Sequence, residues 1–250
     1  MIRVTLRGFM VFPELLTFFK SGIHIAACYE LLKMCPSPAE IAALRIDKLS
    51  KLLSKASHGH FGRSSAEALK SLAKTSVGVK NPYISIQITQ TIASIELLEQ
   101  QIEEIETLIE DTMKELDSVI MTVPGIGAMN GAMILGEIGD ISRFASASKL
   151  LAYAGLDPTV CQSGNFRARS TRMSKRGSKT LRFALINAAW QLTLHSDVFK
   201  AYYNLKRSAG LGHYAALGHV AHKLVRVLFK LLRSRIPFDE NFLLISQAGS

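Results

Sequence analysis

The stretch ITQTIASIELLEQQIEEIETLIEDTMKEL, residues 88–116, decides the fold class of this chain. Isoleucine and leucine recur in it at spacings of three, four or seven residues, as in the seam of a coiled coil. The pattern predicts one long helix over residues 83–119, and it fits an intermolecular coiled coil or an antiparallel hairpin within one subunit equally well. The seam consists of Ile88, Ile92, Ile95, Ile102, Ile105, Ile109 and Leu116.

The other faces of this helix are acidic, and Lys114 is almost the only cation nearby. Negative charge repels the phosphates of DNA, so the helix is expected to bind protein. We therefore predict a homo-oligomer that forms through the helix over residues 88–116. The acidic residues are Glu96, Glu99, Glu103, Glu104, Glu106, Glu110, Asp111, Glu115 and Asp117.

Residues 1–82, before this helix, are predicted to form a compact helical module. Ser37-Pro38-Ala39-Glu40 has the features of a helix start, with a capping serine, proline at the first helical position and an early acid. Leu49, Leu52 and Leu53 share one face of the next expected helix.

Residues 120–250, after the long helix, have the opposite charge. No acidic residue lies between Asp157 and Asp197. No alternating pattern of β-branched and polar residues of useful length appears, so the whole chain is predicted to be all-α. The cations of this basic block are candidate DNA contacts, and they are Arg167, Arg169, Arg172, Lys175, Arg176, Lys179 and Arg182.

Composition narrows the class of protein. Hydrophobic residues make up 48% of the chain, enough for a real core, and 30 Lys and Arg against 20 Asp and Glu give a net charge of +10. That charge favours a polyanionic partner such as nucleic acid or an anionic membrane, with a solvated basic surface as the alternative.

Membrane and metal sites are not predicted. The apolar N-terminal stretch is interrupted by Arg3, Arg7 and Pro13 before it could span a membrane, and it does not resemble a signal peptide. The three cysteines form no CxxC motif and have no nearby histidine pair, so neither a disulfide framework nor a zinc site is expected. A cytoplasmic location follows as an expectation. Trp190 and Tyr202-Tyr203 are expected to pack in the core or at its rim, with base-stacking platforms as the alternative.

A glycine-rich turn, Val123-Pro124-Gly125-Ile126-Gly127, follows the long helix. Glycines allow a tight turn between helices and expose backbone N–H groups that can hold a DNA phosphate without reading sequence. This helix-hairpin-helix-like arrangement makes Gly125 and Gly127 candidate DNA contacts. A plain turn between packed helices fits the same residues.

Ser163-Gly164 lies within the basic block. A serine hydroxyl followed by glycine can approach a phosphate closely, and nearby cations would stabilise the charge of a phosphoryl transition state. Ser163 is therefore a candidate nucleophile, although serine also suits flexible loops.

Several blocks between Val123 and Arg182 occur in an order and spacing that together are specific. They are residues 123–127, 137–140, 144, 150–158, 163–164, 174–177 and 181–182. Together they resemble the C-terminal transposase domain of the insertion-sequence 110 family, relatives of the Piv DNA invertase. The similarity extends back through the long helix to Phe12-Pro13-Glu14-Leu15, so it covers most of the chain.

The resemblance implies a serine-type recombinase that moves DNA with a guide RNA, the bridge RNA, transcribed from the element's own end. Family members pair an N-terminal RuvC-like domain, whose DEDD acids hold magnesium, with a domain that carries the serine nucleophile. The family serine matches Ser163, and Ser174 is the second choice. Arg172, Lys175 and Arg176 are then expected to contact phosphate.

The chain departs from the family pattern before Phe12. Only eleven residues precede that block, and none of them is Asp or Glu. The RuvC-like domain is therefore expected to be missing, with no cofactor held by this chain and magnesium required by the full-length relative. A truncated transposase is predicted, and a non-catalytic DNA- or RNA-binding remnant or an assembly partner of a full-length transposase are the alternatives.

Overall fold

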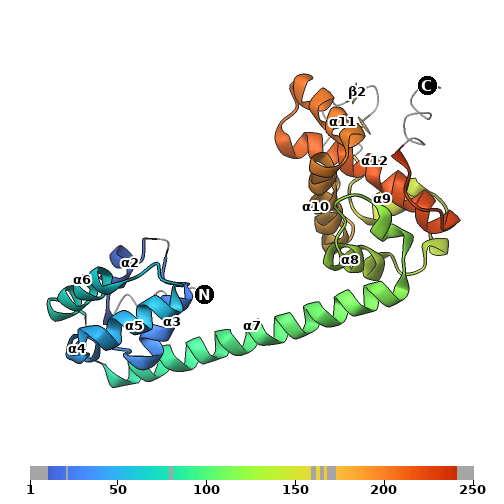
Figure 1. The fold of residues 1–250 in the computed structure, drawn as a ribbon. Coiled ribbons are helices and arrows are strands. Elements are labelled where there is room, and N and C mark those ends of the chain that lie inside the picture. The colour runs from blue at the N-terminus through green and yellow to red at the C-terminus, as the bar shows by residue number, and fades with distance from the viewer. Residues whose placement is uncertain are drawn as a thin grey trace. The chain divides into compact units, whose positions relative to one another are not determined.

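A computed structural model describes residues 11–20, 22–78, 81–158, 162–163, 166–167 and 173–240, with 162–163 and 166–167 described by their backbone alone. The described chain is all-α, as predicted, apart from a two-stranded ladder of β1 (Gln162–Ser163) and β2 (Phe166–Arg167). It divides into two compact units, Met1–Glu103 and Glu104–Ser250, and each is described by itself (Figure 1).

The first unit is built of short helices with clear start signals. Ser37 and Glu40 form the predicted capping box at the start of α4: Ser37 Oγ accepts from the Glu40 N–H at 3.4 Å, and Glu40 Oε2 accepts from the Ser37 N–H at 3.0 Å. The helices are α2 (Leu15–Phe18), α3 (Ala26–Met34), α4 (Pro38–Ala43), α5 (Ile46–Ala56), α6 (Arg63–Lys74) and the first part of α7 (Pro82–Leu116).

The core of the first unit gathers the apolar faces of these helices. Leu49 and Leu53 of α5 are fully buried, as their shared face predicts, and Leu69 of α6 joins them. Ile88 and Ile92, the first two residues of the predicted seam, are buried in the same core. The N-terminal part of α7 therefore stabilises its own unit by burying apolar surface.

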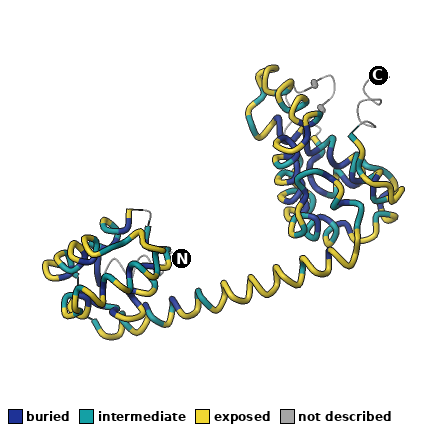
Figure 2. Tube along the Cα trace, in the orientation of Figure 1, coloured by how far each residue is buried: buried dark blue, intermediate teal, exposed yellow. Residues whose placement is uncertain are grey.

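The long helix α7 runs over Pro82–Leu116, close to the predicted span, and ends where Asp117 adopts a positive φ of 41°. Met113, near its C-terminal end, packs into the core of the second unit. Between these buried ends most of the helix is exposed (Figure 2), and Ile95 and Ile109 of the predicted seam are half-buried. The exposed apolar residues there are Leu97, Leu98, Ile102, Ile105 and Leu108. Whether they pair with another chain stays a prediction.

The second unit packs around α10 (Lys179–His195), which contacts three other helices. Alanines 184, 188 and 189 are fully buried on α10, and their small side chains let the neighbouring helices approach closely. The other elements are the end of α7, η1 (Val119–Thr122), α8 (Ala128–Ile138), η2 (Ile141–Arg143), α9 (Ala147–Tyr153), β1, β2, α11 (Asp197–Ser208) and α12 (His213–Ser234). None of the described helices is long and apolar enough to span a membrane.

Candidate functional site

Two segments far apart in the sequence pair directly below the β1–β2 ladder. Residues 153–158, which begin at the last residue of α9, run antiparallel to residues 173–178, before α10, and we call the pair the hairpin base. Its backbone hydrogen bonds run from Ser174 N to Asp157 O (2.8 Å), from Lys175 N to Gly155 O (3.0 Å) and from Ser178 N to Tyr153 O (2.7 Å). The base fixes both ends of the loop that carries β1 and β2.

Glycine is required where the two segments of the hairpin base meet. A Cβ on Gly177 would lie 1.9 Å from the carbonyl oxygen of Tyr153, and Gly155 has a φ of +65°. Backbone can approach backbone this closely only when the side chain is absent. Blocks 150–158 and 174–177 both carry the family resemblance. The close approach of their backbones explains why each block contains a glycine at this point.

Ser174, the second-choice nucleophile, belongs to the hairpin base. Its hydroxyl donates to Asp157 Oδ1 at 2.5 Å and accepts from the Arg176 N–H at 3.5 Å. The first bond ties the 173–178 segment to residues 153–158, and the second lies within the 173–178 segment. The hydroxyl of Ser174 is therefore engaged in holding the loop, which favours a structural role.

Ser163 lies on the loop that the hairpin base holds. It is the second residue of β1, and its backbone pairs with Phe166 while Gln162 pairs with Arg167. The side chains of Ser163 and Arg167 lie outside what the structure describes, as do Arg169 and Arg172 altogether. The predicted roles of these four residues stay predictions.

The described cations of the basic block divide into two kinds. Lys175, Arg176 and Lys179 are exposed, with Lys175 at a φ of +54° and Lys179 at the first position of α10. Arg182 is half-buried, and its Nη1 donates to the carbonyl oxygen of Ala154 at 3.0 Å. Arg182 therefore links α10 to the hairpin base, whereas the other three are free to face a polyanion.

The start of α10 is joined to α8 by a side-chain pair. Ser178 caps α10, because its Oγ accepts from the Leu181 N–H at 3.0 Å, and the same hydroxyl donates to Glu137 Oε2 of α8 at 2.6 Å. The acid of the 137–140 block thereby fixes the point where the basic block enters α10.

The glycine-rich turn joins η1 to α8. Gly125 has a φ of +78°, and a Cβ there would lie 2.8 Å from Cβ of Gln191, so the turn packs directly on α10. Gly127 is the exposed N-cap of α8. The element before the turn is a short 3-10 helix, so the predicted helix-hairpin-helix-like arrangement has an α-helix on one side only.

Two histidines of the second unit have polar partners within it. His222 Nε2 lies 2.6 Å from the carbonyl oxygen of Leu156 in the hairpin base, and burial lowers the pKa of its imidazole. His213 Nδ1 lies 2.7 Å from the hydroxyl of Tyr203. Within the described ranges, no three His, Cys, Asp or Glu side chains are grouped so that they could hold a metal ion.

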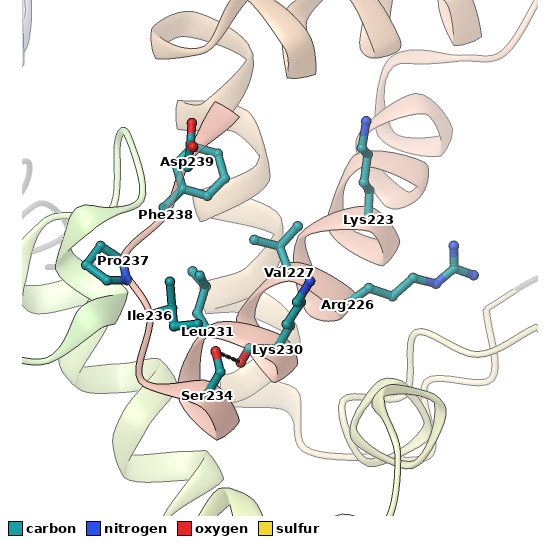
Figure 3. Close-up of a pocket in the computed structure, with 10 residues that line it drawn as sticks. All are labelled: Lys223, Arg226, Val227, Lys230, Leu231, Ser234, Ile236, Pro237, Phe238 and Asp239. Atoms are coloured by element: carbon teal, nitrogen blue, oxygen red, sulfur yellow. Dashed lines mark hydrogen bonds between the residues drawn. The ribbon is translucent and has the colours of Figure 1, made fainter. Parts of the chain in front are cut away.

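A cavity of about 440 Å³ lies along the C-terminal half of α12, in a part of the chain for which the sequence indicated no site. Figure 3 shows Val227, Leu231 and Ile236 around it, with Arg226 extending away from them. The ammonium group of Lys223 is buried without a hydrogen-bond partner among the described residues, and burial lowers its pKa. The absence of acids between His213 and Phe238 was the signal that could have revealed this basic helix.

Part of the second unit is similar to known proteins. Residues 117–204 match the family model described as Transposase IS116/IS110/IS902 family. The match contains the glycine-rich turn, the hairpin base and all of α10. This segment of the chain is therefore similar to the IS116/IS110/IS902 family of transposases.

Individual proteins of insertion elements, and a pilin gene-inverting protein, are also similar to this chain. The chain is 27% identical over 251 residues to the mini-circle protein of IS117 from Streptomyces coelicolor, covering 96% of this chain and 59% of that protein. It is 31% identical over 128 residues to the 43.6 kDa protein of insertion element IS110 from the same organism, covering 49% of this chain and 31% of that protein. The pilin gene-inverting protein of Moraxella bovis is 31% identical over 124 residues, covering 49% of this chain and 38% of that protein. The chain thus spans less than two thirds of each of these relatives.

Proposed function

We propose that this chain acts in DNA transposition, with Ser163 as the nucleophile of a phosphoryl transfer. The proposal is supported by the position of Ser163 on a loop whose two ends are fixed by the hairpin base. That loop lies inside the segment that matches the transposase family. The serine role itself comes from the Ser-Gly pair and the family resemblance.

The proposed reaction exchanges one ester for another. Ser163 Oγ forms a bond to the phosphorus of a DNA phosphodiester, while the bond from phosphorus to a deoxyribose oxygen breaks. The hydroxyl proton leaves the serine, and the departing oxygen gains a proton to become a hydroxyl group. The phosphoserine ester keeps the bond energy, so a second DNA hydroxyl can reverse the step and rejoin a strand.

The exposed cations of the basic block would assist this transfer. Lys175, Arg176 and Lys179 carry charge that can hold a phosphate and stabilise the charge that builds up on it. Magnesium and a guide RNA belong to the proposal for the complete assembly, as the family resemblance implies. The described residues of this chain offer no group of metal ligands.

The experiment is to trap the covalent intermediate. The chain is incubated with labelled DNA that contains the sequences flanking its own gene, denatured, and searched by mass spectrometry for a nucleotide on serine. We expect an adduct on Ser163 that Ser163→Ala abolishes and Ser174→Ala leaves. An adduct that persists in Ser163→Ala would refute the nucleophile assignment.

A second candidate function is assembly with another transposase chain. It is favoured by the exposed apolar residues of α7, from Leu97 to Leu108, which no described residue covers. Their acidic surroundings disfavour DNA and favour a protein partner. In this case Ser163→Ala leaves complex formation and salt-dependent DNA affinity unchanged.

A further inference from the structure

A groove of about 550 Å³ opens in the second unit where the start of α8 faces α10, two helices that pack side by side (Figure 1). Phe183, Asn187 and Trp190 line it from α10, and Asn130 lines it from α8. The glycine-rich turn also lines it, and Gly125 packs on Gln191. Every one of these residues lies within the segment that matches the transposase family.

The aromatic side chains of the groove are exposed, although the unit has a well-formed core. Phe183 is 60% exposed and Trp190 is 39% exposed. The indole of Trp190 is held in place, because the ring of His213 meets it edge to face at 5.2 Å between centroids and His213 is itself bonded to Tyr203. A fixed ring with a free surface is ready to stack on a flat ligand.

Three side-chain amides line the groove without a hydrogen-bond partner in the described part of the chain. The side-chain amides of Asn130, Asn187 and Gln191 form no hydrogen bond with any other residue in the described part of the chain. An amide offers a donor and an acceptor side by side, which matches the edge of a nucleobase. The groove thus combines ring faces with hydrogen-bonding edges.

The face of α10 that lines the groove also carries a positive charge, and we call this face the stripe. Lys179, Phe183, Asn187 and Trp190 fall within one sector of α10, because their spacings are close to whole helical turns. Lys179 is exposed at the N-terminal end of the stripe. Glu110 lines the groove as well, and its carboxylate would repel phosphate. A strand in the groove would therefore place its phosphates towards Lys179.

We infer that this groove binds unpaired nucleotides of a single DNA strand, an inference that rests on the proposed function. Phe183 and Trp190 stack on the bases, and the amides bond to base edges. The two rings are seven residues apart on the helix, about 10 Å along its axis, which is room for about two stacked bases. A closed duplex keeps its base faces covered and cannot use the groove in this way.

The chain contains its own probe, because Trp190 is its single tryptophan. The full chain is titrated with a single-stranded oligothymidine and, separately, with a closed duplex, at matched salt. We expect the single strand to quench the emission of Trp190 and the duplex to leave it nearly unchanged. We expect Phe183→Ala and Phe183→Leu to weaken single-strand affinity by roughly tenfold.

Tyr83→Ala is the control, because Tyr83 is an exposed aromatic residue of the first unit (77% exposed, against 60% for Phe183), and this variant should bind as the parent does. Single-strand binding without a change in emission, or Phe183 variants that bind like the parent, would overturn the inference. Duplex binding through the basic block would survive in that case, leaving the proposed function intact. A parent chain that binds neither single strand nor duplex would overturn both the inference about the groove and the proposed function.

Discussion

The hydroxyl of Ser174 donates to Asp157 Oδ1 over 2.5 Å and joins two segments that are separated by the whole loop carrying Ser163. The contact is half-buried, and the backbone of the same two residues is also bonded, from Ser174 N to Asp157 O. Ser174 therefore joins the two segments of the hairpin base to each other at Asp157 through both its side chain and its backbone. The loop can be loosened there without touching Ser163.

Ser174→Ala removes this side-chain bond to a carboxylate and should lower the free energy of unfolding by about 1.5 kcal/mol. It should also speed tryptic cleavage after Arg167, Arg169 and Arg172. Urea unfolding and limited proteolysis with mass spectrometry measure the two effects. Ser142→Ala is the control, since Ser142 makes a similar bond to Asp140 at an exposed site. Equal cleavage rates in the parent and Ser174→Ala would contradict the role of the hairpin base.

Gly177→Ala should destabilise the second unit, by roughly 1–3 kcal/mol, because the new Cβ would meet the Tyr153 carbonyl oxygen at 1.9 Å. Gly136→Ala offers the opposite result from the same chemical change. Gly136 is inside α8 with nothing within 4 Å of an added Cβ, so alanine should stabilise the helix by about 1 kcal/mol. Thermal unfolding measures whether Gly177→Ala loses stability and Gly136→Ala gains it. A Gly177→Ala protein as stable as the parent would show that the close approach of Gly177 to the Tyr153 carbonyl is not needed.

Lys223 should make stability depend on alkaline pH. Its ammonium lies 5.3 Å from the ring centroid of Phe199 without a hydrogen-bond partner among the described residues, and burial lowers its pKa below the usual 10.5. The folded state therefore releases this proton at lower pH than the unfolded state, so stability rises as pH increases through the folded pKa towards 10.5.

Lys223→Met removes the buried charge and should be more stable than the parent at neutral pH, with a difference that shrinks as the pH approaches 10.5. Urea unfolding over this range provides the measurement. Lys200→Met, at an exposed lysine of α11, should show no such convergence. A constant offset between Lys223→Met and the parent at every pH would rule out the burial argument.

Ser37→Ala should cost the first unit about 1 kcal/mol, because it removes the acceptor that caps α4. Ser71→Ala, at an exposed interior position of α6, should be neutral or slightly stabilising, since alanine favours helix. Circular dichroism during urea unfolding distinguishes the two. If Ser71→Ala lost as much stability as Ser37→Ala, the loss of the α4 cap would not be the cause of the Ser37→Ala effect.

Ile105→Lys should weaken self-association if α7 pairs between chains, because it places a charge among the exposed apolar residues of the helix. Glu103→Gln makes the same change in net charge on the opposite face of the helix and should leave association intact. Light scattering across a range of protein concentrations gives the mass of each. A parent chain that stays monomeric at every concentration would refute the oligomer prediction.

The candidate site was predictable only in part. The block of cations after Asp157 and the glycine-rich turn are visible in the sequence, but their individual roles are not. Arg182 looks like its cationic neighbours in the sequence, yet it bonds to the backbone of Ala154. The exposed groove beside Phe183 and Trp190 was not anticipated, because an aromatic residue in an amphipathic helix is usually buried.

The sequence by itself determined the helices, since heptad spacing over residues 88–116 and the cap at Ser37 act between neighbours three or four positions apart. It also carried the ordered blocks, within residues 123–182, that resemble the insertion-sequence 110 family. Only the tertiary structure decided that residues 153–158 pair with 173–178 and that the start of α8 faces α10. Such contacts depend on closing long loops and packing whole faces, and no local pattern of residues records which distant segments will meet.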